Sequence, residues 1–233
     1  MLKTLGVGIL VIGSVFALGV QAQSPEMQQR LAEVKQAMAT NKQMLAQFSW
    51  TEQDVISLKG EEKKEEIYNV QLGPNGKPQK TPVDPNMSDD ERKKRGLRGR
   101  IIEKKTEEYQ EYAQSIKTLI EQYVPPDKDK LQAANQQGNV MIGGEPGNPG
   151  EYRVVITNYV KQGDNMTLVM NKARKNLASL TISTYLSDPS DAVKVNVQFS
   201  QIPGGPNHVS SETINGVSKQ LTIAVTNSNY QQL

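Results

Sequence analysis

His208, Ser210 and Ser211 are the residues of this chain closest in type to a serine nucleophile with its base. His208 is the only histidine, and it follows a proline-rich turn at the start of an extended segment. A serine nucleophile also needs a positioned base and oxyanion donors. No nucleophile-elbow pattern surrounds these residues, so we interpret His208 as an ordinary loop histidine.

Carboxylates are plentiful enough to suggest paired acids, which could hydrolyse glycosides. Lysines and arginines alternate with them, and mixed charge of this kind is typical of a solvated surface. Asp188 and Asp191 lack calcium-loop spacing, and the chain has no cysteine to bind metal or act as a nucleophile. We therefore predict a protein that is not an enzyme, with no metal and no cofactor. The runs of carboxylates comprise Glu61, Glu62, Glu65, Glu66, Asp89, Asp90 and Glu91.

One run of basic residues is the sharpest charge feature of the sequence. In a chain whose net charge is only +2, such a run does not indicate a nucleic-acid partner. It suggests contact with an anionic membrane surface. The alternative is a solvated helical turn, since acidic neighbours partly neutralise the run. The expected anionic-contact patch consists of Arg92, Lys93, Lys94, Arg95, Arg98 and Arg100.

The first 22 residues have the pattern of a secretory signal peptide. Lys3 precedes an apolar run from Leu5 to Leu18, and small residues at Val20 and Ala22 predict cleavage between Ala22 and Gln23. The alternative is an uncleaved anchor, but the run is shorter than the ~20 apolar residues that span a bilayer. We expect an exported protein of the bacterial periplasm, or a secreted one. The absence of cysteine suits a bacterial envelope protein.

The elements that follow change period along the chain. Apolar residues at helical spacing predict an amphipathic helix from Ser24 to about Leu45. From Gln47 the period becomes two, which predicts strands over 48–58 and 68–72 with a hairpin turn at Lys59-Gly60-Glu61-Glu62. The ribbon is unusually polar, and we expect it to lie at an edge or to be solvated on one face. Its acidic residues are Glu52, Asp54, Glu62, Glu65 and Glu66.

The middle of the chain differs from both ends. Three prolines between Pro78 and Pro85 mark a loop, and helical patterns then extend to Gln137. We interpret residues 84–137 as a helical insertion in a single domain that covers residues 23–233. The glycine-rich stretch at 143–150 is expected to be a flexible connection.

The last third of the chain reads as strands joined by tight turns. Alternation is cleanest from Val193 to Phe199, and Asn215-Gly216 has the signature of a type I′ hairpin turn. Such spacing predicts an antiparallel meander, because parallel pairing needs long crossovers. We predict an α+β fold whose sheet is covered by the amphipathic helices.

In its order of elements the chain resembles the outer-membrane lipoprotein-sorting (LolA-like) carriers. The resemblance lies in the striped helix, the polar strand pair from Phe48 to Leu72, and the strands ending at Tyr230 with a loop at Gly204-Gly205. It implies an unclosed, strongly curved antiparallel β half-barrel with helices in its concave side. It also implies an apolar hollow for acyl chains, and so a non-catalytic carrier of a lipid or an acylated protein.

The alternative function is a structural or regulatory envelope interaction protein of the same fold, its hollow filled by its own side chains. For the carrier, large apolar and methionine side chains suit an adaptable lining. The alternative for each of them is a place in a closed core. The candidate lining residues are Trp50, Tyr68, Met166, Leu168, Met170 and Tyr185.

Overall fold

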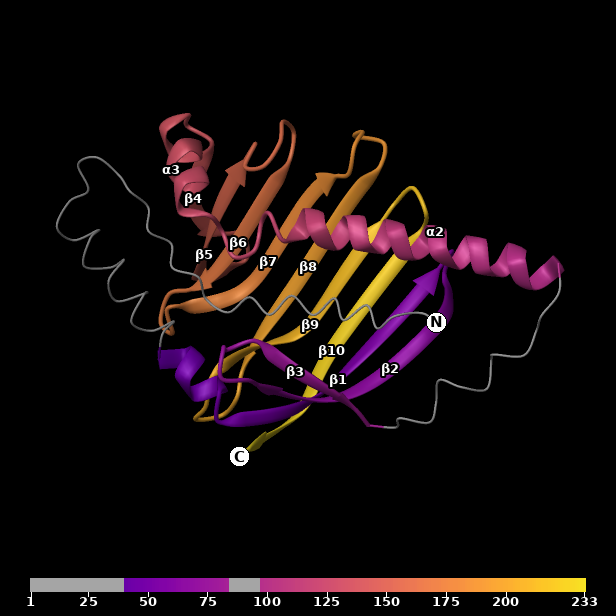
Figure 1. Cartoon of the computed structure of the whole chain (residues 1–233). Helices are drawn as coiled ribbons and strands as arrows, with labels where there is room; N and C mark the ends of the chain where they lie inside the picture. Colours follow the sequence, from indigo (N-terminus) through magenta and orange to yellow (C-terminus); the bar gives the residue numbers. More distant parts are fainter. Residues whose placement is uncertain (1–39, 84–96) are drawn as a thin grey trace.

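Ten antiparallel strands form one open sheet in the computed structural model, which describes residues 40–83 and 97–233 (Figure 1). The spatial order of the strands is β3-β2-β1-β10-β9-β8-β7-β6-β5-β4, so β3 and β4 are the two edges and the sheet does not close. The strands are β1 (Phe48–Leu58), β2 (Glu61–Leu72), β3 (Pro78–Pro82), β4 (Val140–Glu145), β5 (Asn148–Thr157), β6 (Asn165–Asn171), β7 (Asn176–Tyr185), β8 (Ala192–Gln201), β9 (Asn207–Gly216) and β10 (Leu221–Gln232).

The expected antiparallel meander is confirmed. From β4 to β10 each strand pairs with the next one in sequence, and β1, β2 and β3 form a second meander. The two meanders meet where β1 pairs with β10. The hairpin turn after β1 is confirmed as well, but it is shorter than expected, because Glu61 and Glu62 already belong to β2. Its two residues, Lys59 and Gly60, have positive φ, at 54° and 78°, as a type I′ turn requires.

Two helices lie in the described part of the chain between β3 and β4. They are α2 (Leu97–Ile120) and α3 (Lys128–Gln136). Asp127 caps α3, because its carboxylate accepts from the backbone N–H groups of Asp129 and Lys130 at 3.0 and 2.9 Å. Figure 1 shows α2 running across the strands of the β7–β10 region. Of the helix expected over 24–45, only residues 40–45 belong to the described part, and they are helical.

Three local sequence predictions are wrong. Residues 143–150 are not a flexible connection but part of the β4–β5 hairpin, turned by Pro146 and by Gly147, whose φ is 78°. Pro78 and Pro82 bound strand β3, not a loop. Gly216 is no turn glycine: it ends β9 paired with Leu221, and the chain turns over 217–220.

The main core lies between α2, α3 and one face of the sheet. Its helical side chains include Ile116, Ile120 and Tyr123, all fully buried. On the sheet they meet the inward row of β8, Val193, Val195 and Val197, which is also fully buried. We call this face of the sheet the inner face. A second, smaller cluster contains Leu45, Trp50, Tyr68 and Val70.

Candidate functional site

The three candidate methionine and leucine residues of β6 lie together on the inner face. Met166, Leu168 and Met170 alternate along the strand, and all three are buried in the main core. That core also contains Tyr123 and Leu131 of the helical segment. The structure therefore brings half of the predicted lining together, at the β4 side of the sheet.

Helix α2 comes close to the sheet over Gly216 of β9. A Cβ atom at position 216 would lie 2.5 Å from the Tyr112 ring and 2.7 Å from Ile116 Cδ1. The Tyr112 hydroxyl donates to Asp191 at 2.7 Å and accepts from Ser218 at 3.1 Å. The missing side chain of Gly216 thus makes room for the helix at this point.

The C-terminal end of α2 is attached through a buried polar network. The Tyr123 hydroxyl lies 2.6 Å from an Asp164 carboxylate oxygen, to which it donates, and 2.7 Å from the Thr184 hydroxyl. Asp164 also accepts from three successive backbone N–H groups, those of 159–161, at 2.6, 2.8 and 2.9 Å. Burial, and then the Asp164 carboxylate, raise the pKa of Tyr123. The tyrosine is therefore a neutral donor at any ordinary pH, and it fixes the helix to the β5–β6 loop.

The other end of the sheet carries an aromatic cluster. Trp50, the only tryptophan of the chain, stacks on Tyr230 with ring centroids 5.5 Å apart, and Tyr230 contacts His208 at 4.0 Å. Tyr68, on the neighbouring strand β2, is buried with Trp50. Burial lowers the pKa of His208, so the neutral imidazole is favoured in this cluster. Trp50 and Tyr68 thus lie together, but in a cluster separate from that of Met166, Leu168 and Met170.

Between the two clusters the inner face carries buried carboxylates. Glu52 and Asp54 are 4% and 3% exposed, and Glu212 of β9 is 2% exposed. The ribbon, expected to lie at an edge or to be solvated on one face, does expose Glu62 and Glu65 of β2, whereas Glu52 and Asp54 of β1 are buried. Side chains alternate between the two faces along a strand, so Glu52 and Asp54 lie on the same face of β1 as Trp50 and Ile56. They therefore face inward.

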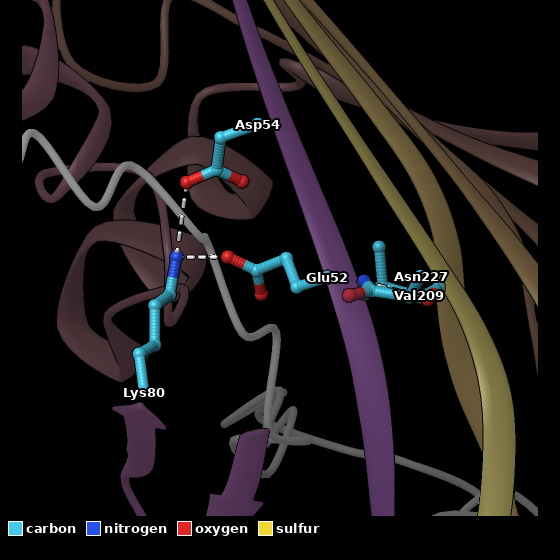
Figure 2. A network of polar contacts seen from close by, with 5 residues as sticks. All are labelled: Glu52, Asp54, Lys80, Val209 and Asn227. Atoms are coloured by element: carbon cyan, nitrogen blue, oxygen red, sulfur yellow. Dashed lines mark hydrogen bonds and ion pairs between the residues drawn. The ribbon is translucent and has the colours of Figure 1, made fainter. Parts of the chain in front are cut away.

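Lys80 of the edge strand β3 neutralises part of this charge. Its ammonium pairs with Glu52 and lies 3.4 Å from an Asp54 oxygen, so that both carboxylates turn toward it (Figure 2). It also lies 5.4 Å from the centroid of the Tyr68 ring. The second carboxylate oxygen of Asp54 is buried without a hydrogen bond. Burial raises the pKa of Asp54 to about 7, with Lys80 opposing and Glu52 adding to the rise.

Beside this cluster the ladder between β9 and β10 ends. Its last pair is Ser211 with Thr226, and from there β10 continues only along β1. The side chain of Asn227 donates to the Val209 carbonyl at 3.0 Å (Figure 2). The Tyr230 hydroxyl donates to the same oxygen at 3.3 Å. Side chains thus supply hydrogen bonds where the backbone ladder stops.

The remaining predicted site residues lie elsewhere. Tyr185 lies on the face of β7 opposite to the buried Ile182 and Thr184. Its ring lies beside the Lys161 ammonium, and its hydroxyl donates to the Gln162 carbonyl at 2.9 Å. The structure does not bring it together with the other five. Arg92, Lys93, Lys94 and Arg95 lie outside the described residues, and Arg98 and Arg100 are described only as backbone in the first turn of α2.

Within 40–83 and 97–233, no helix is both long and apolar enough to cross a bilayer. In the same ranges, no three histidine, aspartate or glutamate side chains gather so that they could hold a metal ion.

Comparisons with known proteins give distant likenesses of structure only. No protein-family model and no curated protein sequence matches the chain. A DUF1329 family protein from Desulfovibrio piger is similar with a TM-score of 0.41 and 10% identity, over 86% of this chain and 92% of that one. A LolA superfamily protein from Nitrosomonas europaea is similar with a TM-score of 0.37 and 9% identity, over 86% and 93%.

Proposed function

We propose that this protein is an exported, non-catalytic carrier that holds a lipid, or the acyl group of a lipoprotein, between its helices and the inner face of its sheet. The observation that carries the proposal is the continuous row of buried apolar side chains from β6 to β10 on an unclosed sheet, with α2 packed against it. Because the sheet does not close, movement of the helix could admit a guest to its inner face. Each buried methylene of an acyl chain contributes ~0.8 kcal/mol, so affinity needs few polar contacts.

In this mechanism α2 acts as the lid over the sheet. It is held at two points, Tyr112 over Gly216 and Tyr123 on Asp164. Its buried side chains occupy the face that an acyl chain would take, so binding requires the helix to shift. Met166 and Met170 suit such a surface because the thioether side chain adapts its shape.

The experiment is lipid analysis of protein exported with its own first 22 residues from a Gram-negative bacterium. Protein purified from the periplasmic fraction without detergent is extracted and analysed by mass spectrometry. We expect stoichiometric acyl lipid. Met170→Gln, on the inner face, should lower the amount recovered, while Met141→Gln, at a residue 58% exposed on β4, should not. An empty wild-type protein, or retention of the protein in the cytosol, contradicts the carrier proposal.

One observation favours the alternative, an envelope interaction protein of the same fold with no small ligand. Ile116, Ile120 and Tyr123 of α2 and the following turn are at most 1% exposed, so the protein's own side chains fill the face beneath them. In that case the basic run from Arg92 to Arg100 is the working surface. An empty, stable protein that still binds anionic vesicles supports this second function.

A further inference from the structure

Strand β3 has little apolar contact with the rest of the molecule. It has five residues, Pro-Gln-Lys-Thr-Pro, and none of them is buried. It pairs only with β2, from Tyr68 opposite Pro82 to Leu72 opposite Pro78. Because proline has no amide hydrogen, only Gln79, Lys80 and Thr81 can donate to the ladder. Hydrophobic burial therefore does not explain why this strand stays on the sheet.

The side chain of Lys80 adds an attachment to the backbone ladder with β2. Lys80 lies opposite Val70 in the register, on the inner face. Its ammonium reaches past β2 to Glu52 and Asp54 of β1 (Figure 2). It also lies beside the Tyr68 ring. Besides its ladder with β2, the strand is thus held by one long charged side chain that enters a buried acidic site.

The charge of this site depends on how many protons its two carboxylates hold. With one carboxylate protonated, the remaining negative charge and the Lys80 ammonium cancel. With both ionised, the buried site carries a net charge of −1. With both protonated, the ammonium is left without an anion. A buried uncompensated charge is costly, so the neutral combination is the most stable of the three.

We propose that β3 is a proton-linked strap whose attachment to the sheet is strongest when Glu52 and Asp54 together carry a single negative charge. Above and below that range the strap detaches more often, and the inner face at Tyr68 and Val70 opens. The device does not depend on which of the two functions above is correct.

The other charged groups near the site do not change the net charge of Glu52, Asp54 and Lys80. Glu66, opposite Asp54 on β2, pairs with Lys64 at 2.8 Å. The Tyr68 phenol stays neutral, because burial and the neighbouring carboxylates raise its pKa. Glu212 lies two strands away, opposite Val225 of β10. The Lys42 side chain packs against Gly76 in the β2–β3 turn; its Nζ would lie 2.8 Å from a Cβ atom built on that glycine.

The remaining titratable groups near this end are aromatic. Tyr230 of β10 has a pKa raised by burial and by Glu52, and His208 of β9 has a pKa lowered by burial. Both are therefore neutral near pH 7. The upper limit of the neutral range is set by Asp54, whose pKa burial raises to about 7.

The test is hydrogen exchange with mass spectrometry on the full chain between pH 4 and 9, expressed as protection factors that correct for intrinsic rates. We expect protection of residues 67–72 and 78–83 to pass through a maximum below pH 7. It should fall about tenfold per pH unit at most on the alkaline side. Peptides of β8, in the main core, provide the reference and should show no such maximum.

Three variants separate the strap from a merely structural role. Asp54→Asn keeps one negative charge against Lys80, so the alkaline fall should disappear while the acidic fall remains. Lys80→Met keeps the length of the stem but removes the ammonium, so protection should decrease as the pH rises and show no maximum. Lys77→Met, at an exposed residue of the preceding turn, should behave as the wild type. A pH-independent wild type, or an alkaline fall that persists in Asp54→Asn, overturns the proposal.

Discussion

At the scale of single residues, Gly216 shows how one absent side chain positions a helix. It lies in a strand, where glycine is ordinarily unfavourable because it has no side chain to pack. Here the close approach of Tyr112 and Ile116 explains it. The hydroxyl of Tyr112 then reaches Asp191 and Ser218, so the packing contact and the two hydrogen bonds fix the same stretch of α2.

We therefore expect Gly216→Ala to destabilise the protein by about 1–3 kcal/mol, the usual cost of overpacking a filled core. Urea unfolding followed by circular dichroism measures the loss. The matched control is Gly143→Ala on the edge strand β4, where an added Cβ meets no atom within 4 Å. Equal stabilities of the two variants would show that α2 does not rest on Gly216.

The acidic residues of β1 mark where residue-level prediction failed and where it could have succeeded. The sequence predicted a polar ribbon at an edge or solvated on one face but not the burial of Glu52 and Asp54, since glutamate and aspartate are rarely buried without a partner. Their positions along the strand indicate burial, because Glu52 and Asp54 are two and four residues after Trp50 and so lie on its face of β1. The partner, Lys80, is 26 residues beyond Asp54 in an unpredicted strand. Burial of the pair therefore depended on a contact that no local pattern contains.

At the scale of elements, the two edges of the sheet differ. Strand β3 has a proline at each end and an inward lysine, features that discourage further pairing. Strand β4 exposes Met141 and Ile142 and has no proline. Both strands were missed because each is short and stabilised mainly by its neighbour. By contrast, the hairpin turn after β1 depends on a local signal at Lys59-Gly60, and the sequence predicted a turn there.

The basic run before and within the start of α2 carries a prediction of its own. Replacing Arg95, Arg98 and Arg100 by glutamine should weaken binding to phosphatidylglycerol vesicles at low salt by about tenfold or more, since each such charge near an anionic surface contributes ~1 kcal/mol. Vesicle co-sedimentation measures the bound fraction. The matched control replaces Lys172, Arg174 and Lys175 in the exposed β6–β7 turn. Equal loss in both triple variants indicates net charge alone and contradicts a specific patch.

At the scale of the whole molecule, Asp54 links stability to pH. Its pKa rises from 3.8 in the unfolded chain to about 7 in the folded one. The folded state therefore holds this proton more tightly, and the resulting stabilisation is complete below about pH 4. It is lost as the pH rises through 7. The direction is opposite to that of a surface carboxylate in a salt bridge.

Asp54→Asn should remove this dependence. Between pH 5 and 8 the free energy of unfolding of the wild type should fall by about 2 kcal/mol more than that of the variant. Urea titrations followed by the fluorescence of Trp50 measure the free energy of unfolding of the wild type and of the variant. Glu62→Gln, at an exposed residue of β2, is the control and should follow the wild type. Parallel curves for wild type and Asp54→Asn would falsify the assignment of the titration to this group.

The pairing of β1 with β10 also has a consequence for how the molecule assembles. Every other ladder joins neighbours in sequence, but this one joins residues such as Glu52 and Asn227, at opposite ends of the described chain. Strands β1 to β3 can form their antiparallel meander early, but β1 cannot pair with the rest of the sheet until β10 has been synthesised. Such distant closure is slow, because its entropic cost comes before any stabilising contact. Loss of β10 would therefore release the first three strands together and leave β9 as a bare edge.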